Sequence, residues 1–165
     1  MALDATVGGA SSNSYATVAE ADAYFVTHLK NASWMGLADE ATKEIYLQSA
    51  TRYLDQFVDW FGQKVSDDNA LDWPRYGFSE YASNEIPTLL KQVVFEMALH
   101  LIDNDGVLSN EGSVDKVKVG PINVSLKENG YDTYLFPPFI AAIIAPLGGP
   151  RGTGPSSMGS VKLVR

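Results

Sequence analysis

The segment Asn69–Tyr81, "NALDWPRYGFSEY", concentrates the side chains of this sequence that are best suited to binding. It contains, in order, Trp73, Pro74, Arg75, Tyr76, Phe78 and Tyr81. Aromatic rings interleaved with an arginine can stack on unpaired nucleic-acid bases. The same residue types can instead pin a loop to a hydrophobic core or form a protein interface. The residue types alone leave both interpretations of Trp73, Pro74, Arg75 and Tyr76 open.

Residues that could support catalysis or metal binding are present, but their spacing does not form a recognisable site. The two histidines, His28 and His100, have no metal-ligating partner at helical spacing. The sequence has no cysteine, which excludes thiolate chemistry and disulfides. Pro155 stands where a phosphate-binding loop running from Gly149 to Gly154 would require lysine. We therefore predict that the protein is not an enzyme and has no catalytic residue, metal site or cofactor.

The net charge of −8 is unevenly distributed along the 165 residues. Residues 1–145 carry a net charge of −11, whereas residues 146–165 contain three basic residues and no acidic one. An acidic surface binds nucleic acid poorly, because Lys and Arg supply most of the affinity by neutralising phosphates. In the segment Asn69–Tyr81 the charge therefore favours a loop anchor or protein interface over base stacking.

The composition is typical of a single globular domain without a membrane segment. Apolar residues make up 45% of the chain and charged residues 19%, which argues against overall disorder. The N-terminal stretch lacks the basic and apolar regions of a signal peptide, and no run of about 18 apolar residues occurs. These features predict a cytosolic protein that is not inserted in a membrane.

Apolar residues repeat with helical spacing in four segments. Residues 17–29 begin with a Thr17–Glu20 capping box and place Val18, Ala21, Phe25 and Leu29 on one face. A second helix is predicted from an Asp39 cap to Phe61, stopping at Gly62. A third begins at Pro87 and is apolar on nearly all sides, which predicts the central core helix. A short fourth helix starts at Pro137 or Pro138 and ends before Pro146.

Strand-like alternation replaces the helical period in residues 114–127, where Lys116 and Lys118 alternate with Val117 and Val119 before a turn at Gly120. This pattern predicts a β-hairpin. The fold class predicted is therefore mainly α: a small bundle of about four helices with one β-hairpin and an extended C-terminal tail. The predicted organisation is a helical domain over residues 1–145 and an arm over residues 146–165.

The predicted arm is rich in Gly, Pro and Ser and cannot bury enough apolar surface to fold alone. Its basic and strand-like residues suit addition to a sheet edge of another protein. The residues predicted to bind that partner are Arg151, Val161, Lys162, Leu163, Val164 and Arg165.

Four stretches between residues 14 and 102 resemble small proteins encoded among the head-assembly genes of tailed bacteriophages. They read "SYATVAEADAYFVTHL", "ATRYLDQFVDWFGQK", "ALDWPR" and "IPTLLKQVVFEMAL". These relatives are head–tail adaptor (connector) proteins, and some members carry the label DnaT-like single-stranded-DNA-binding protein. The marks of the resemblance are Tyr53, Leu54, Asp55, Gly62, Trp73, Pro74, Arg75, Ile86 and Pro87.

The resemblance implies a structural virion protein in the neck, assembled in the bacterial cytoplasm. Such a subunit would form a homo-oligomeric ring, of about twelve copies, under the portal protein and would extend the DNA channel. Its other partners would be the next neck or tail-completion protein and passing double-stranded DNA, which it would not bind tightly. The alternative function is a single-stranded-DNA-binding replication accessory protein that stacks bases on Trp73, Arg75 and Tyr76.

Overall fold

The computed structural model describes residues 2–104, 116–119, 122–125 and 137–151. Five helices lie in these ranges: α1 (Val18–Phe25), α2 (Asn31–Met35), α3 (Glu40–Phe57), α4 (Thr88–Asp103) and α5 (Pro138–Ile144). The strands are β1 (Val58–Trp60), β2 (Gln63–Lys64), β3 (Arg75–Tyr76), β4 (Lys116–Val119), β5 (Ile122–Ser125) and β6 (Gly148–Pro150). The antiparallel pairs are β1 with β6, β2 with β3, and β4 with β5. The predicted mainly α class is confirmed.

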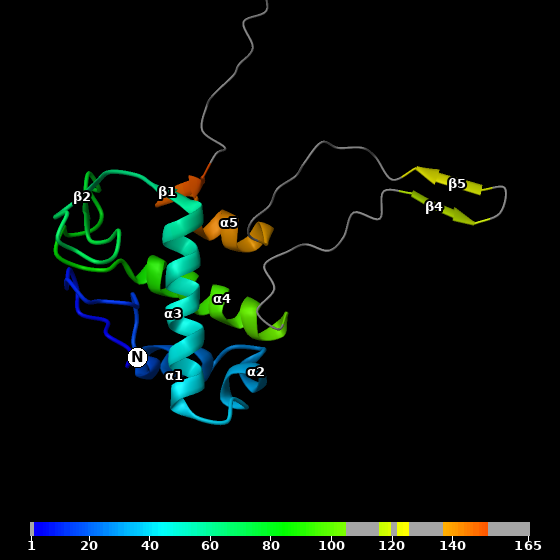
Figure 1. Cartoon of the computed structure of the whole chain (residues 1–165), viewed down its shortest axis with the longest axis horizontal. Coiled ribbons are helices and arrows are strands. Elements are labelled where there is room, and N and C mark those ends of the chain that lie inside the picture. Colours follow the sequence, from blue (N-terminus) through cyan, green and yellow to red (C-terminus); the bar gives the residue numbers. More distant parts are fainter. Residues whose placement is uncertain (1, 105–115, 120–121, 126–136, 152–165) are drawn as a thin grey trace, which may run out of the picture.

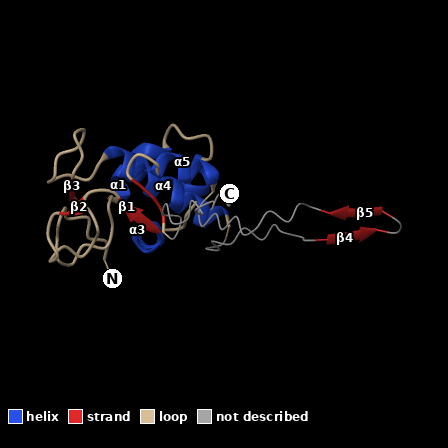
Figure 2. Cartoon of the chain, turned by 90° about the horizontal axis from the view of Figure 1, so that it is seen from above, coloured by secondary structure: helices blue, strands red, loops and turns tan. Residues whose placement is uncertain are grey.

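Helix α4 is the centre of the hydrophobic core. Eight of its residues are buried, and α1, α2, α3 and α5 all pack against it. Figure 1 shows α3 crossing α4, with α1 and α2 near the beginning of α3 and with β1 and α5 near its end. Viewed from above, the helices gather on one side of the body and a large loop region gathers on the other (Figure 2).

The first helix is capped as predicted but is shorter. The Thr17 hydroxyl accepts a hydrogen bond from the Glu20 amide, and the Glu20 carboxylate accepts one from the Thr17 amide. The helix ends at Phe25, and Leu29, predicted on its apolar face, is fully exposed. The chain turns instead into the short α2, which the sequence did not predict. Its buried Trp34 stacks on Phe25 and donates its indole N–H to Asp22 at 2.7 Å.

The second predicted helix also begins as expected and ends early. The Asp39 side chain accepts from the Thr42 amide at 2.7 Å, as the sequence predicts. The helix stops at Phe57, because residues 58–60 extend into β1 with Val58 and Trp60 buried and Asp59 exposed. Phe61, predicted as part of the apolar stripe, therefore lies beyond the helix and is 54% exposed.

Strand β6 joins the C-terminal part of the described chain to the helical body. Val58 pairs with Pro150, Asp59 with Gly149 and Trp60 with Gly148. Arg151 follows and donates from Nε to the Asp59 carboxylate at 2.9 Å. Residues 148–151, which the sequence assigned to the arm that begins at residue 146, thus contact the helical body. Arg151, predicted to bind a partner, pairs within its own chain.

The predicted hairpin is present as a pair of strands, with Lys116 opposite Ser125 and Val119 opposite Ile122. Its turn residues, Gly120 and Pro121, lie outside the described residues, as do the predicted partner-binding residues 161–165. None of the helices in the described ranges is long and apolar enough to cross a membrane.

Candidate nucleic-acid interface

Trp73 anchors the long loop between β1 and α4. Its side chain is 1% exposed, and its ring lies 5.0 Å from that of Phe78 and 6.0 Å from that of Trp60, measured between centroids. Pro74, joined to Trp73 by a cis peptide bond, is buried beside it. Among the described residues, the Trp73 indole N–H has no hydrogen-bond partner. A base could stack on Trp73 only if this part of the core opened.

Arg75 holds the loop against β1 through backbone carbonyl groups. Its guanidinium donates to the carbonyl oxygens of Phe61 (2.8 Å), Gly62 (2.9 Å), Asp72 (3.1 Å) and Trp60 (3.4 Å). These bonds use the fork of N–H groups that would otherwise grip a phosphate. Arg75 therefore positions the loop rather than offering a free cation.

Tyr15 and Asp55 connect this loop to the N-terminal segment and to α3. The Tyr15 hydroxyl donates to Asp55 Oδ1 at 2.5 Å and accepts from the backbone amides of Asp72 (3.1 Å) and Trp73 (3.2 Å). Asp55 also accepts from the Trp60 indole N–H at 3.1 Å and from the Asp72 amide at 3.2 Å. Four separate segments thus share one buried hydrogen-bond network.

Burial raises the pKa of both members of this pair. Loss of solvation raises the pKa of Asp55 to about 6, against the opposing effect of the Tyr15 hydrogen bond, and the charge of Asp72 raises it further. Burial raises the pKa of Tyr15 in the same direction, with the Asp55 charge as the next cause. Tyr15 therefore remains a neutral hydrogen-bond donor.

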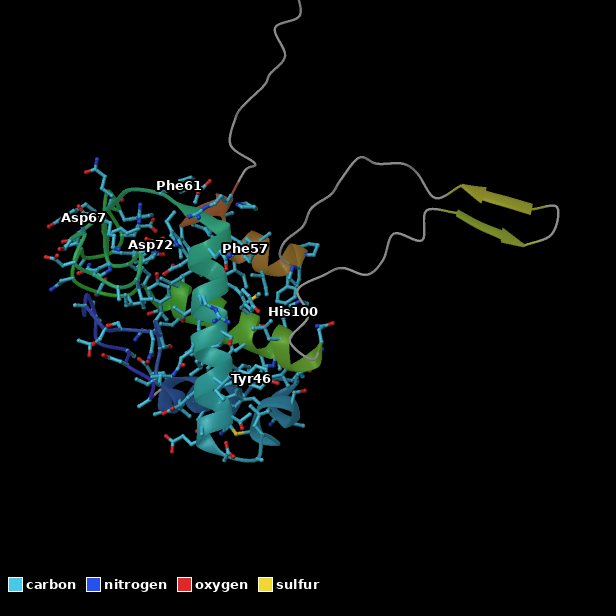
Figure 3. All side chains as sticks on the ribbon, in the orientation of Figure 1. Tyr46, Phe57, Phe61, Asp67, Asp72 and His100 are labelled. Atoms are coloured by element: carbon cyan, nitrogen blue, oxygen red, sulfur yellow. The ribbon has the colours of Figure 1, made fainter. Side chains whose placement is uncertain are left out.

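Two aromatic residues at the β2–β3 pair face solvent: Tyr76 in β3, and Phe61 just before β2. We call β2, β3, Phe61 and Tyr76 the aromatic ribbon. Phe61 is 54% exposed and Tyr76 is 51% exposed. Gly62 and Gly77 both have positive φ, at 71° and 103°, and a side chain at Gly62 would meet the Tyr76 carbonyl oxygen at 2.0 Å. This close approach, together with Arg75, fixes the backbone that carries Phe61 and Tyr76. Figure 3 shows Phe61 beyond the end of α3, at the edge of the body.

A groove of ≈ 780 Å³ runs along α3 on the side of the N-terminal segment. One wall comes from α3, and the other comes from the N-terminal segment and the loop before Trp73; we call it the α3 groove. It is lined by Ser12, Asn13, Ile45, Gln48, Ser49, Arg52, Asp55, Gln56, Ala70 and Leu71. Its size falls within the range of small-ligand sites, and most of its polar groups are uncharged.

Most cationic side chains of the described body already have partners. Lys30, Lys43, Lys91 and Arg151 form ion pairs with Asp103, Asp22, Glu20 and Asp59. Lys64 donates to the Asn69 carbonyl at 2.8 Å. Arg52 makes no ion pair with a described carboxylate, and its guanidinium carbon lies 5.5 Å from the centroid of the Tyr53 ring. Within the same described ranges, no cluster of three His, Asp or Glu side chains could hold a metal ion.

The fold and these surfaces define a small, mainly helical protein that presents an aromatic ribbon and a polar groove. The chain belongs to the family described as "Putative DnaT-like ssDNA binding protein", whose model matches residues 1–165. No curated protein and no solved structure matched the chain. The family match supports the DnaT-like label within the resemblance noted from the sequence, and it provides no evidence for a head–tail adaptor.

The residues singled out from the sequence lie together, but in different environments. Trp73 and Pro74 are buried and Arg75 is held by carbonyl groups, whereas Tyr76 faces solvent. Sequence reasoning missed Phe61 as an exposed aromatic because it was assigned to the helix. Gly62, already used as the helix stop, could not reveal this, because the helix ends at Phe57 where residues 58–60 pair with β6.

Proposed function

We propose that the protein binds single-stranded DNA, mainly by stacking unpaired bases on Phe61 and Tyr76. The observation that carries this proposal is the exposure of about half of each aromatic side chain on a backbone fixed by Arg75 and Gly62. Membership of a family described as ssDNA-binding supports it. This site replaces the one expected from the sequence, because Trp73 is buried and Arg75 is engaged.

The aromatic ribbon is suited to bases because it is preorganised. Base–aromatic stacking contributes about 1 to 3 kcal/mol per base and tolerates any sequence. A backbone that is already ordered loses little conformational entropy on binding, so more of the stacking energy appears as affinity. We therefore expect binding with little dependence on base sequence.

The charge of the body predicts an unusual salt dependence. Residues 2–104 contain six basic and fifteen acidic residues, and most of the basic ones have internal partners. Each phosphate neutralised on a single strand contributes a slope of about −0.7 to the plot of log affinity against log salt concentration. Because stacking supplies most of the affinity, the slope should be shallow, near −1 rather than the steep value of a basic protein.

Fluorescence anisotropy with a labelled oligothymidine tests the proposal. The double variant Phe61→Ala/Tyr76→Ala should bind at least about tenfold more weakly, since the loss of two stacked bases costs about 2 kcal/mol or more. Phe139→Ala provides a matched control, because Phe139 is an exposed aromatic (50%) on α5, away from the ribbon. Absence of binding by the wild-type protein, or an equal loss in the control, would overturn the proposal.

A second candidate is a head–tail adaptor subunit that forms a ring under a phage portal. The observation that favours it is a pair of exposed apolar regions on different parts of an acidic body. Val26 (63%) and Leu29 (101%) follow α1, while Phe61 and Tyr76 lie on the ribbon near the end of α3. Two different apolar patches suit a head-to-tail contact, which closes into a ring when the rotation allows. An acidic channel wall would also repel passing DNA.

Native mass spectrometry separates the two candidates. An adaptor subunit should assemble into a closed ring, alone or with a portal protein, and Leu29→Asp should abolish that assembly without affecting binding to oligothymidine. A wild-type protein that remains monomeric in the presence of a portal would contradict the adaptor candidate. A ring that fails to bind oligothymidine would instead contradict the first proposal.

A further inference from the structure

The helical wall of the α3 groove reaches to within a few residues of the aromatic ribbon along the chain. Its helical wall consists of residues spaced three or four apart, which project from one side of a helix: Ile45, Gln48, Ser49, Arg52 and Gln56. Only β1 separates the end of α3 from Phe61. In Figure 3, Phe61 lies beyond the end of α3 that carries Gln56, and Tyr46 marks the part of α3 nearer its beginning. The groove wall and the ribbon are therefore carried by successive segments of the chain, α3 and the stretch that follows β1.

The wall opposite α3 is held in place before any ligand arrives. The Ala70 amide donates to the Gly9 carbonyl at 3.1 Å, which ties the loop to the N-terminal segment. Within that segment, the Ser12 hydroxyl donates to the Thr6 carbonyl at 2.5 Å, and Asn13 Oδ1 accepts from the Asp4 amide at 2.8 Å. A ligand would meet a formed groove, which limits the entropy lost on binding.

The groove differs in charge from the rest of the body. Ser49 contributes a hydroxyl and Gln56 an amide, whose donors and acceptors match the edges of unpaired bases. Arg52 is the cation of the groove, and its position over the Tyr53 ring keeps the N–H groups at the guanidinium edge available for a ligand. Asp55 also lines the groove, but its carboxylate accepts hydrogen bonds from Tyr15, Trp60 and Asp72.

We propose that the α3 groove carries a single DNA strand onward from the aromatic ribbon. Arg52 contacts one backbone phosphate, while Ser49 and Gln56 contact base edges. This inference rests on the proposed ssDNA binding and adds a path and a set of residues to it. A phosphate at Arg52 gives the bound strand a fixed register relative to the bases stacked on Phe61 and Tyr76.

The test compares Arg52→Gln with Lys30→Gln in oligothymidine binding over a range of salt concentrations. Both changes remove one positive charge from an exposed side chain, but Lys30 pairs with Asp103 and lies outside the α3 groove. Arg52→Gln should weaken binding severalfold and make the salt slope shallower by about 0.7, the contribution of one single-strand phosphate. Lys30→Gln should leave the slope unchanged. Circular dichroism of both variants checks that the fold is intact.

Photo-crosslinking gives a second, independent readout. A 4-thiothymidine oligonucleotide bound to the wild-type protein should crosslink to the peptide that contains residues 49–56 as well as to the ribbon. Two results would overturn the groove assignment, provided that the wild-type protein binds DNA. One is an equal salt slope for Arg52→Gln and Lys30→Gln; the other is crosslinking to the ribbon alone. If the wild-type protein binds no oligothymidine, the proposed function itself fails and the groove assignment fails with it.

Discussion

Asp55 is the residue on which the candidate interface most depends, because its carboxylate accepts hydrogen bonds from three other segments. Tyr15 comes from the N-terminal segment, Trp60 from β1 and Asp72 from the long loop. Partial removal from water makes the charged form costly, while the three donors compensate for part of that cost. The protonation state of Asp55 is consequently linked to the stability of the fold.

We predict that Asp55 makes stability fall as the pH rises toward neutrality. Folding raises its pKa from 3.8 to about 6, so the native state binds the proton more tightly than the unfolded chain. The resulting stabilisation is fully present below the unfolded pKa and is lost as the pH rises through the folded pKa. Between about pH 4 and about pH 7 the wild-type protein should lose on the order of 2 kcal/mol relative to Asp55→Asn.

Denaturant unfolding, followed by far-UV circular dichroism at several pH values, measures this difference. Asp67→Asn removes the same charge at an exposed loop position and serves as the control. If the difference in unfolding free energy between wild type and Asp55→Asn stays constant with pH, the prediction is wrong, because Asp55 then does not couple stability to pH.

At the scale of elements, the aromatic ribbon is built by backbone contact rather than by a hydrophobic core. Gly62 adopts φ 71° and approaches the Tyr76 carbonyl too closely for any side chain. Arg75 closes the same junction from the other strand by donating to the Phe61 and Gly62 carbonyls. The position of Phe61 and Tyr76 thus depends on a glycine and an arginine that do not face the ligand.

Gly62→Ala should therefore damage the ribbon strongly. The added methyl group would meet the Tyr76 carbonyl oxygen at 2.0 Å, and the positive φ adds strain, so we expect a loss of stability of about 2 kcal/mol or more. Gly149→Ala is the matched control, because nothing lies within 4 Å of a methyl group placed there. Thermal unfolding of the two variants checks the difference; equal melting temperatures would mean that the ribbon can relax around the added methyl.

Local signals predicted the elements better than they predicted the site. The Thr17 and Asp39 caps and the apolar α4 depend on residues a few positions apart, so the sequence alone places them. The end of α3 depends instead on β1 pairing with β6, a partner about ninety residues away that no local pattern reveals. For the same reason the exposure of Phe61 and the network around Asp55 emerged only from the three-dimensional structure.

At the scale of the whole molecule, β6 connects the C-terminal part of the described chain to β1, which lies near the middle of the sequence. Asp59 pairs with Gly149 in the strand register, and the Arg151 side chain then bonds to the Asp59 carboxylate and to the carbonyls of Asp55 and Val58. Leu147, just before β6, is fully buried. Residues 147–151 therefore contribute to the same structure that carries the candidate interface.

A comparison of two truncations tests this contribution. A chain that ends after Leu147 loses β6 and Arg151, whereas a chain that ends after Arg151 keeps both. The shorter chain should melt several degrees lower, because it loses the β1–β6 hydrogen bonds and exposes Trp60, and a loss of about 1 kcal/mol shifts the melting temperature of such a domain by about 2 to 8 °C. Equal melting temperatures would show that β6 adds nothing to the body.

The packing of α5 against α4 has a consequence for how this chain can vary. Helix α4 ends at Asp103 and α5 begins at Pro138, and the two helices are in direct contact. Asn104, just after α4, and Phe139, in the first turn of α5, line one pocket, so the two ends that residues 105–137 connect lie close together. A change in the number of connecting residues should therefore cost little, because closure entropy grows only with the logarithm of length. The junction is a natural insertion point: sequences of different length and recognition properties can be exchanged there during evolution or by engineering, while the core, the ribbon and the groove stay as they are.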